Sequence, residues 1–150
     1  MTRFSGVECL GRQRQTEVYR TLVSTMTKDQ KFSLKIVETF RKAKIIGVRS
    51  GTEHRYTGVW VVVVGNRVFA RSWSDKPTGW FRAFKKEPKG TVQLEKLEIP
   101  VQAKQVRSAR VRDSVTEAFA EKYNTKGSLK WVEGFREPER VVTTVEFVPR

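Results

Sequence analysis

The sequence predicts an α+β protein in which a mainly antiparallel β-barrel or rolled sheet is flanked by helices. Three observations lead to this fold class. Stretches with helical periodicity are separated by short strand-like segments, two of these segments are joined by a two-residue turn, and no strand–helix unit repeats as it would in a parallel sheet. The chain has 150 residues, of which 38% are hydrophobic, so it is long enough for one domain with its own core.

The domain is expected to occupy residues 26–150. Residues 1–25 show little periodicity and are predicted to be an N-terminal arm, either disordered or a short helix. Thr27 and Gln30 have the spacing of a capping box. Behind them an apolar stripe predicts a helix that runs to about Lys42; the stripe consists of Phe32, Ile36, Val37 and Phe40.

The middle of the chain is predicted to be β-structure. Residues 43–48 favour a short strand, and the β-branched run 59–64 favours a strand that is buried on both faces or shared with a partner subunit. Gly65 and Asn66 both tolerate positive φ, which suits a tight hairpin turn. The returning strand is expected over residues 68–73, where the side chains alternate.

After the hairpin, residues 80–86 favour a short helix and residues 91–95 a strand. The alternation changes phase at residues 96–97, so the strand should end or bulge there. A further strand is expected over residues 99–106, with Pro100 at its edge or start, because proline cannot donate to a sheet ladder.

The C-terminal part predicts one helix and one strand. Residues 112–114 precede an apolar stripe of helical spacing, and Gly127 is a suitable residue just past a helix end, so a helix is expected between them. Residues 140–148 are predicted to close the chain as a strand.

The charge of the chain points to an anionic partner. There are 30 Lys and Arg against 16 Asp and Glu, which gives a net charge of +14, and +12 of this lies before residue 105. No block of five or six basic residues occurs, so a merely cationic, solvated surface is an equal alternative. The longest apolar run is six residues, which is too short for a membrane span.

Composition also restricts the chemistry. One cysteine and one histidine exclude a disulfide framework and a Cys/His zinc site, and we expect no metal and a cytoplasmic location. The histidine, His54, lies in a cationic loop, where we favour loop or ligand contact over a role as general base. No catalytic residue is therefore assigned, and any enzymatic activity would depend on a cofactor.

The first candidate site is a glycine-flanked basic turn. In the stretch Gly47-x-Arg49-Ser50-Gly51-x-x-His54-Arg55, a turn could offer backbone N–H groups, two guanidinium groups and a hydroxyl to a phosphate. The alternative is an ordinary hairpin loop with solvated arginines.

The second candidate site contains two tryptophans. Trp73 and Trp80 lie in Ser72-Trp73-Ser74 and Thr78-Gly79-Trp80-Phe81-Arg82, where they could stack on a planar ring whose phosphate is held nearby. Equally, Trp80 could be a core residue of a short amphipathic helix.

From about Thr27 to Arg150 the sequence resembles a bacterial family of unknown function whose members look like flavin-binding split barrels. The segments that carry the resemblance are Thr27-Lys28-Asp29, Gly58-Val59-Trp60-Val61-Val62-Val63, Val68-Phe69-Ala70-Arg71-Ser72, Gly79-Trp80-Phe81-Arg82, Ala118-Phe119-Ala120-Glu121-Lys122-Tyr123 and Thr143-Thr144-Val145-Glu146-Phe147-Val148-Pro149-Arg150.

The same stretch is more distantly similar to the deazaflavin-dependent nitroreductases, which share the split-barrel fold of the pyridoxamine-phosphate oxidases. In those enzymes a Gly-Arg-x-Ser/Thr-Gly loop and a downstream arginine hold the cofactor phosphate. The matching residues here are Gly47, Arg49, Ser50, Gly51 and Arg55. Val48 stands where arginine is usual, Gly58 where proline is usual, and Arg82 at the asparagine of a Trp-Tyr-x-Asn segment.

The resemblance implies a split β-barrel homodimer that binds FMN or a deazaflavin near its interface, with hydride transfer at the ring as the possible reaction. It implies phosphate contacts from Arg49, Ser50, Gly51 and Arg55, and ring or tail contacts from Ser72, Trp73, Trp80 and Arg82. The competing hypothesis is a basic nucleic-acid-binding β-barrel without enzymatic activity, in which exposed tryptophans stack on bases.

Overall fold

A computed structural model describes residues 31–150 of the protein. The predicted N-terminal arm and the capping box at Thr27 and Gln30 lie outside the described residues. In the part that is described, none of the helices has the length and apolar character needed to cross a membrane.

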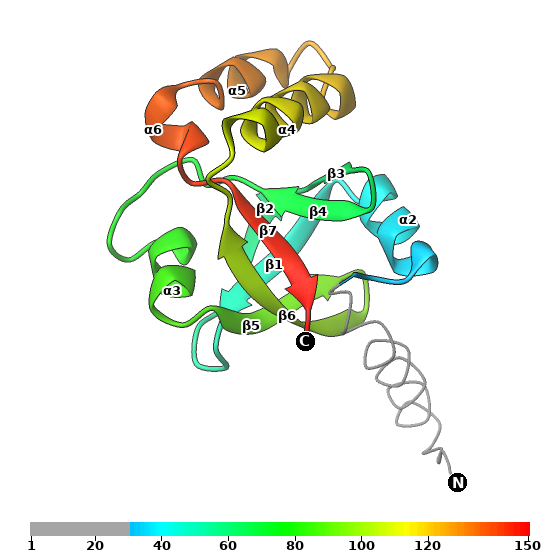
Figure 1. Cartoon of the computed structure of the whole chain (residues 1–150), viewed down its shortest axis with the longest axis vertical. Coiled ribbons are helices and arrows are strands. Elements are labelled where there is room, and N and C mark those ends of the chain that lie inside the picture. The colour runs from blue at the N-terminus through cyan, green and yellow to red at the C-terminus, as the bar shows by residue number, and fades with distance from the viewer. Residues whose placement is uncertain (1–30) are drawn as a thin grey trace, which may run out of the picture.

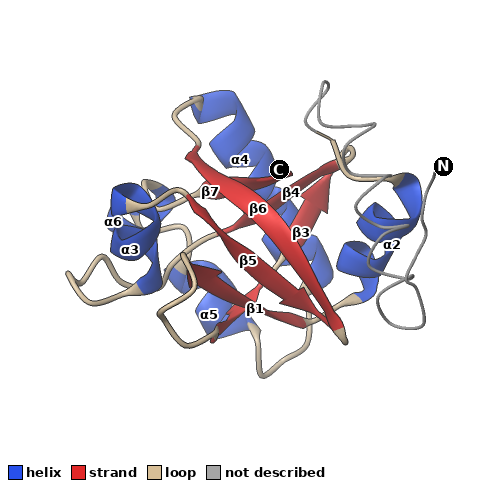
Figure 2. Ribbon diagram, turned by 90° about the horizontal axis from the view of Figure 1, so that it is seen from below, coloured by secondary structure: helices blue, strands red, loops and turns tan. Residues whose placement is uncertain are grey.

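The strands form one antiparallel sheet that curls into an almost closed barrel (Figure 1 and Figure 2). Its order is β2-β1-β5-β6-β7-β4-β3, and each neighbouring pair is antiparallel. The strands are β1 (Ile45–Ser50), β2 (Thr57–Trp60), β3 (Val62–Val64), β4 (Arg67–Ala70), β5 (Lys89–Leu94), β6 (Leu97–Gln105) and β7 (Val145–Pro149). The predicted fold class, an α+β split barrel with flanking helices, is confirmed.

The apolar run 59–64 forms both ends of this sheet, because β2 and β3 are consecutive in the chain. Before Val61 the run pairs with β1, and after Val61 it pairs with β4. The prediction of one strand over residues 59–64 was therefore wrong, because Val61 belongs to neither β2 nor β3. Val59, Val61 and Val62 are buried, whereas Trp60, Val63 and Val64 are half-buried.

The change of partner at Val61 is stabilised by a side chain from outside the sheet. The Tyr123 hydroxyl accepts from Val61 N at 3.1 Å and donates to Lys44 O at 2.6 Å. The hydroxyl thus bridges the backbones of Lys44 and Val61, where a direct hydrogen bond between the strands would otherwise lie. Their polar groups therefore keep hydrogen-bond partners where the strands separate.

Two turns follow from single residues. Gly65 has φ +64° and forms the first central residue of the β3–β4 hairpin, as in a type II′ turn. The predicted change of phase at residues 96–97 is a tight turn in which Glu95 has φ 56° and Leu94 pairs with Leu97. The strand thus ends there, as expected.

The placement of Pro100 at a strand edge or start was wrong, because β6 lies between β5 and β7 and Pro100 is its fourth residue. Pro100 O accepts from Arg150 N at 3.3 Å, at the last residue of the chain. The side of Pro100 that lacks an N–H therefore faces the end of the ladder with β7, where a missing donor does least harm.

Five helices occur among residues 31–150. They are α2 (Leu34–Lys42), α3 (Trp80–Lys86), α4 (Ala109–Lys122), α5 (Leu129–Gly134) and α6 (Pro138–Val141). The predicted end of α2 at Lys42 and both bounds of α3 are correct. The start of α2 was predicted too early, because residues 31–33 are not helical and Ser33, which accepts from Ile36 N, is the N-cap. Helix α4 begins earlier than predicted, because Ser108 accepts from Val111 N and caps it there.

The predicted C-terminal strand 140–148 was wrong in its first half, where α6 follows Pro138 and only residues 145–149 are β7. Proline at the first position of a helix loses no hydrogen bond, which explains the helix start. Helix α5 was not predicted.

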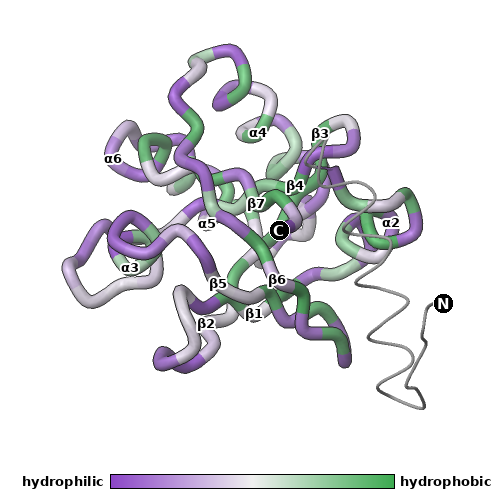
Figure 3. The backbone as a smooth tube through the Cα atoms, turned by 60° about the horizontal axis from the view of Figure 1, so that its bottom comes forward, coloured by the Kyte–Doolittle hydropathy of each residue, from purple (hydrophilic) through white to green (hydrophobic). Residues whose placement is uncertain are grey.

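The helices divide the hydrophobic core into two clusters. The larger cluster fills the barrel beneath α2 and α3 and includes Phe40, Val61 and Phe147. The smaller one lies between the outside of the sheet and the α4–α5 cap, around Phe119. Hydrophobic stretches run along the strands, and the outer loops are mainly hydrophilic (Figure 3). Helices α4, α5 and α6 gather at one end of the barrel (Figure 1).

Candidate functional site

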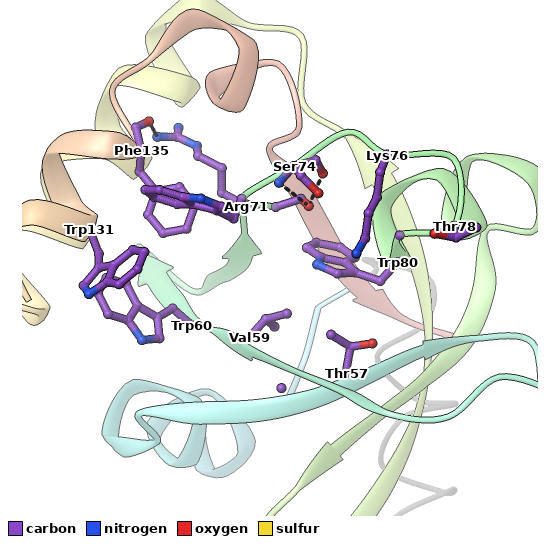
Figure 4. Close-up of a pocket in the computed structure, with 14 residues that line it drawn as sticks. Thr57, Val59, Trp60, Arg71, Ser74, Lys76, Thr78, Trp80, Trp131 and Phe135 are labelled. Carbon is purple, nitrogen blue, oxygen red and sulfur yellow. Dashed lines mark hydrogen bonds between the residues drawn. The ribbon is translucent and has the colours of Figure 1, made fainter.

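A pocket of about 570 Å³ lies where the barrel fails to close (Figure 4). We call this opening the seam: it is bounded by β2, by the segment 71–80 that follows β4, and by α5. The residues that line the pocket are Thr57, Gly58, Val59, Trp60, Arg71, Ser72, Trp73, Ser74, Lys76, Thr78, Gly79, Trp80, Trp131 and Phe135. Its volume is typical of a small-molecule site.

Aromatic rings form much of the wall. Trp73 lies edge-on to Trp131 and to Phe135, with ring centroids 5.0 and 5.4 Å apart, and the two tryptophans are 39% and 43% exposed. Trp60 stacks on Tyr123 with its centroid 3.9 Å away. Such exposed rings at a pocket mouth are suited to contact with a planar ligand.

Trp73 is held in place by its surroundings. Arg140 lies with its guanidinium carbon 3.6 Å from the Trp73 ring centroid, and its Nε donates to Trp73 O at 2.8 Å. The edge of the ring packs on Gly134, where a Cβ atom would collide with it. The indole is therefore fixed by a cation–π contact and by a glycine that leaves room for it.

Trp80 belongs both to the pocket and to the core. It is half-buried at the start of α3, and its ring centroid lies 6.2 Å from that of Phe84 and 6.4 Å from that of Phe147. Trp80 therefore packs in the core and also lines the pocket, which were the two alternatives considered for it.

The charge lining the pocket is positive. Arg71 and Lys76 are among the lining residues, and no aspartate or glutamate is. Lys76 is exposed and its ammonium group lies near Trp80 in the cavity (Figure 4). A ligand with negative charge would therefore meet cations and no carboxylate in this part of the structure.

Arg71 is an unusual buried cation, with 1% of its surface exposed. Its guanidinium donates to Thr144 Oγ1 at 2.8 Å, Thr116 Oγ1 at 2.9 Å, Phe135 O at 3.0 Å and Arg112 O at 3.1 Å. None of these acceptors is a carboxylate. Burial, followed by the charge of Arg112, lowers the pKa of Arg71 to about 10, so it remains protonated at neutral pH.

The predicted contact residue Ser72 lines the pocket, but its hydroxyl is engaged within the loop. Ser72 Oγ donates to Ser74 O at 2.5 Å, and its backbone N donates to Thr143 Oγ1 at 2.8 Å. These bonds shape the segment that carries Trp73, and they end β4 at residue 70.

Arg82 lies outside the set of lining residues. It forms a two-point ion pair with Asp75, with N–O distances of 2.6 and 3.0 Å. The pair joins α3 to the loop that carries Lys76, and the hydrogen bond to Arg82 lowers the pKa of Asp75.

The residues of the predicted phosphate turn lie apart from the lining residues. Ser50 is buried and its hydroxyl donates to Ala83 O at 3.0 Å and Glu87 O at 2.7 Å, which fastens β1 to α3. Gly51 has φ +60° and provides the turn that follows.

The two arginines of that turn differ in their surroundings. The guanidinium carbon of Arg49 lies 4.5 Å from the Tyr56 ring centroid, and its Nε is buried with no hydrogen-bond partner among the residues described. Arg55 is exposed, two residues before Thr57, which does line the pocket. Neither arginine is among the residues that line the pocket.

The structure thus brings together Ser72, Trp73 and Trp80. Among the lining residues that the sequence analysis did not select as site residues are Trp60, Lys76 and Trp131. Trp60 was assigned to a buried strand, and Trp131 lies on the helix that was not predicted. Lys76 adjoins the second predicted cluster in sequence, and the shared loop was the signal that could have identified it.

The residues of the pocket fit a phosphorylated flavin-type group. Its volume, its tryptophans and the absence of acidic residues from its lining suit a planar ring with an anionic tail. Lys76 is the lining cation that is free to approach such a tail, since Arg71 is bound from within the protein.

The barrel and its seam define the class of this protein as an α+β split barrel with a pocket at the open side. The chain belongs to the family described as "Uncharacterized protein conserved in bacteria (DUF2255)", which it matches over residues 33–147. The resemblance to a bacterial family of unknown function is thereby confirmed.

Two solved structures support the fold. The conserved hypothetical protein Rv2991 from Mycobacterium tuberculosis is similar with a TM-score of 0.54 and 13% identity, over 77% of this chain and 78% of that one. A putative pyridoxamine 5'-phosphate oxidase from Listeria innocua has a TM-score of 0.51 and 14% identity, over 77% and 90%. At such identities the likeness shows the fold alone. No curated protein matches the sequence.

Proposed function

We propose that this protein binds a phosphorylated flavin or deazaflavin in the pocket at the seam. The observation that carries the proposal is the combination of four tryptophans with cationic and without acidic lining residues in one pocket. The similarity in fold to a putative pyridoxamine 5'-phosphate oxidase is consistent with it.

In this proposal the ring lies among Trp60, Trp73, Trp80 and Trp131. These side chains offer flat apolar surfaces and exclude water from a bound ring. Lys76 donates to the phosphate, and the buried charge of Arg71 adds a positive potential to the wall. When bound, such a cofactor supplies hydride transfer at its ring.

A fluorescence titration tests the proposal. The pocket contains all four tryptophans of the chain, so binding of FMN or a deazaflavin should quench most of the tryptophan emission. If neither quenches it, while an oligonucleotide binds with a steep salt dependence, the nucleic-acid hypothesis is the better one.

Paired variants locate the phosphate. Lys76→Ala should weaken FMN about 3–10-fold, as expected for one exposed charge contact, and leave riboflavin unchanged because riboflavin has no phosphate. Lys35→Ala, an exposed lysine on α2, is the control and should change neither.

The same comparison distinguishes the turn that the sequence analysis selected. Arg49→Ala and Arg55→Ala should have no phosphate-dependent effect if Lys76 holds the phosphate. If they remove the preference for FMN over riboflavin and Lys76→Ala does not, the phosphate extends past Thr57 to the turn, and the ring assignment stands.

We also propose that the protein is a homodimer. The described residues include four exposed large apolar side chains in or near the α5–α6 region and the pocket, namely Trp73, Leu129, Trp131 and Val142, and exposed apolar residues of this kind are suited to contact with a partner subunit. Light scattering after size exclusion would give twice the chain mass of 17.4 kDa, and a monomeric mass at micromolar concentration would contradict the proposal.

A further inference from the structure

The backbone of β2 at its outer edge is exposed to the pocket. β2 is the terminal strand of the sheet and pairs with β1 alone, so its other edge has no strand beside it. Because β2 residues line the pocket, this edge is one of its walls.

The direction of each backbone group follows from the ladder. Gly51 N donates to Lys89 O at 2.8 Å, so odd-numbered residues of β1 direct their polar groups to β5 and even-numbered ones to β2. Val48 is paired with Thr57 and Ile46 with Val59. The polar groups of Thr57 and Val59 are therefore used by β1.

It follows that the N–H and C=O of Gly58 point away from β1, to the seam. The hydrogen bonds of the Tyr123 hydroxyl agree with this alternation. The hydroxyl bridges Lys44 O and Val61 N, which belong to the next pair of residues along β1 and β2 whose backbone polar groups point toward each other. Among the hydrogen bonds within residues 31–150, none satisfies the Gly58 groups. Since Gly58 has no side chain, it lines the pocket with its backbone.

We propose that Gly58 recognises the ring edge of the ligand by pairing its N–H and C=O with an adjacent carbonyl and N–H, the pattern of a cyclic imide. This inference rests on the proposed function and specifies the ring. A flavin or deazaflavin carries an imide at one end of its ring system, and a ring without one leaves a donor and an acceptor of β2 unsatisfied when it displaces water.

The geometry of the strand favours a flat partner of this kind. One residue of an antiparallel strand exposes its donor and acceptor side by side, as it does to a neighbouring strand. The four tryptophans line the same pocket as Gly58, so a planar imide that pairs with β2 would also contact aromatic rings.

Ligand analogues test the inference without changing the protein. FMN methylated at the imide nitrogen lacks the donor that Gly58 O accepts, and it should bind about 10–100-fold more weakly than FMN. Equal binding of the two would overturn the role of Gly58 while leaving the proposed function intact. Failure of FMN itself to bind would overturn both.

Two variants of Gly58 form a matched pair. Gly58→Ala and Gly58→Pro both add a Cβ, which lies 3.3 Å from Ile45 Cγ2, but only the proline removes the N–H. Proline is tolerated where an edge strand's N–H is not paired, so both variants should fold, as checked by circular dichroism. The proline variant should bind FMN at least about tenfold more weakly than the alanine variant.

A third probe controls for the volume of the proline ring. Phenazine-1-carboxylate is planar, tricyclic and anionic but has no imide, and it should bind both variants equally. Weaker binding of this probe to Gly58→Pro alone would mean that the ring obstructs the pocket. The comparison of FMN with its methylated form in the wild-type protein would then decide the inference.

Discussion

Replacing Arg71 by methionine measures what a buried guanidinium without a carboxylate partner contributes to this fold. The side chain joins the end of β4 to α4, to the last turn of α5 and to the segment before β7 through four hydrogen bonds. Methionine keeps much of the length of the side chain and removes both the charge and the donors.

The magnitude depends on which partners are left without a bond. Thr116 Oγ1 still donates to Arg112 O at 3.0 Å, and Thr144 Oγ1 still donates to Val141 O at 2.6 Å. Phe135 O loses the donor that the structure gives it. One buried carbonyl left without a donor costs about 1–3 kcal/mol. The other lost bonds of the guanidinium add little to this cost, because methionine also avoids the desolvation of a buried charge.

The assay is thermal and urea unfolding of three proteins. A loss of about 1–3 kcal/mol lowers the Tm of a domain of this size by about 2–12 °C. Arg71→Lys should be less stable than Arg71→Met, because it keeps a buried charge with fewer donors to satisfy it. A methionine variant as stable as the wild type would refute the reasoning and mean that the buried cation makes no net contribution to the stability of the fold.

Two further predictions concern Tyr123 and Gly134. Burial raises the pKa of Tyr123 to about 12 from its ordinary 10.0, so its stabilising effect is complete below pH 10 and is lost as the pH rises from 10 to 12. Tyr123→Phe should lower the free energy of unfolding at pH 7 by about 1–3 kcal/mol, because Val61 N loses its acceptor. The variant should also show a smaller decrease in Tm between pH 10 and 12 than the wild type. An equal decrease in both proteins would mean that other groups cause it. Gly134→Ala should displace Trp73, which a Cβ there would strike, and so shift its fluorescence and weaken FMN; Gly127→Ala has open space and should do neither.

The sequence was sufficient for elements whose cause is local. The hairpin at Gly65 and the helix from Trp80 to Lys86 depend on turn chemistry and on periodicity within a few residues, and both are correct. The start of β7 was wrong because Pro138 and a short helix occupy residues that alternate like a strand. Periodicity over so few residues does not separate the two.

The pocket was only partly predictable because its walls come from separate parts of the chain. Trp73 and Trp80 share one loop and could be selected together. Trp60 belongs to a run that is core on sequence grounds, and its exposure to the pocket depends on the change of partner at Val61, which requires Tyr123 from a distant helix. Trp131 joins them because α5 packs against the end of β4, a contact held by Arg71.

The net charge of +14 does not by itself explain affinity for an anion at this pocket. Exposed charges farther than about 8–10 Å from a ligand are largely screened at physiological salt, so most of the surplus acts on the rate of encounter. Affinity depends on the charges in the wall, which are Arg71 and Lys76 without a compensating carboxylate among the lining residues. We therefore expect added salt to slow FMN association more than it speeds dissociation, and Lys76→Ala to act mainly on dissociation. The reverse pattern, measured by stopped-flow quenching, would mean that the general surface charge holds the phosphate.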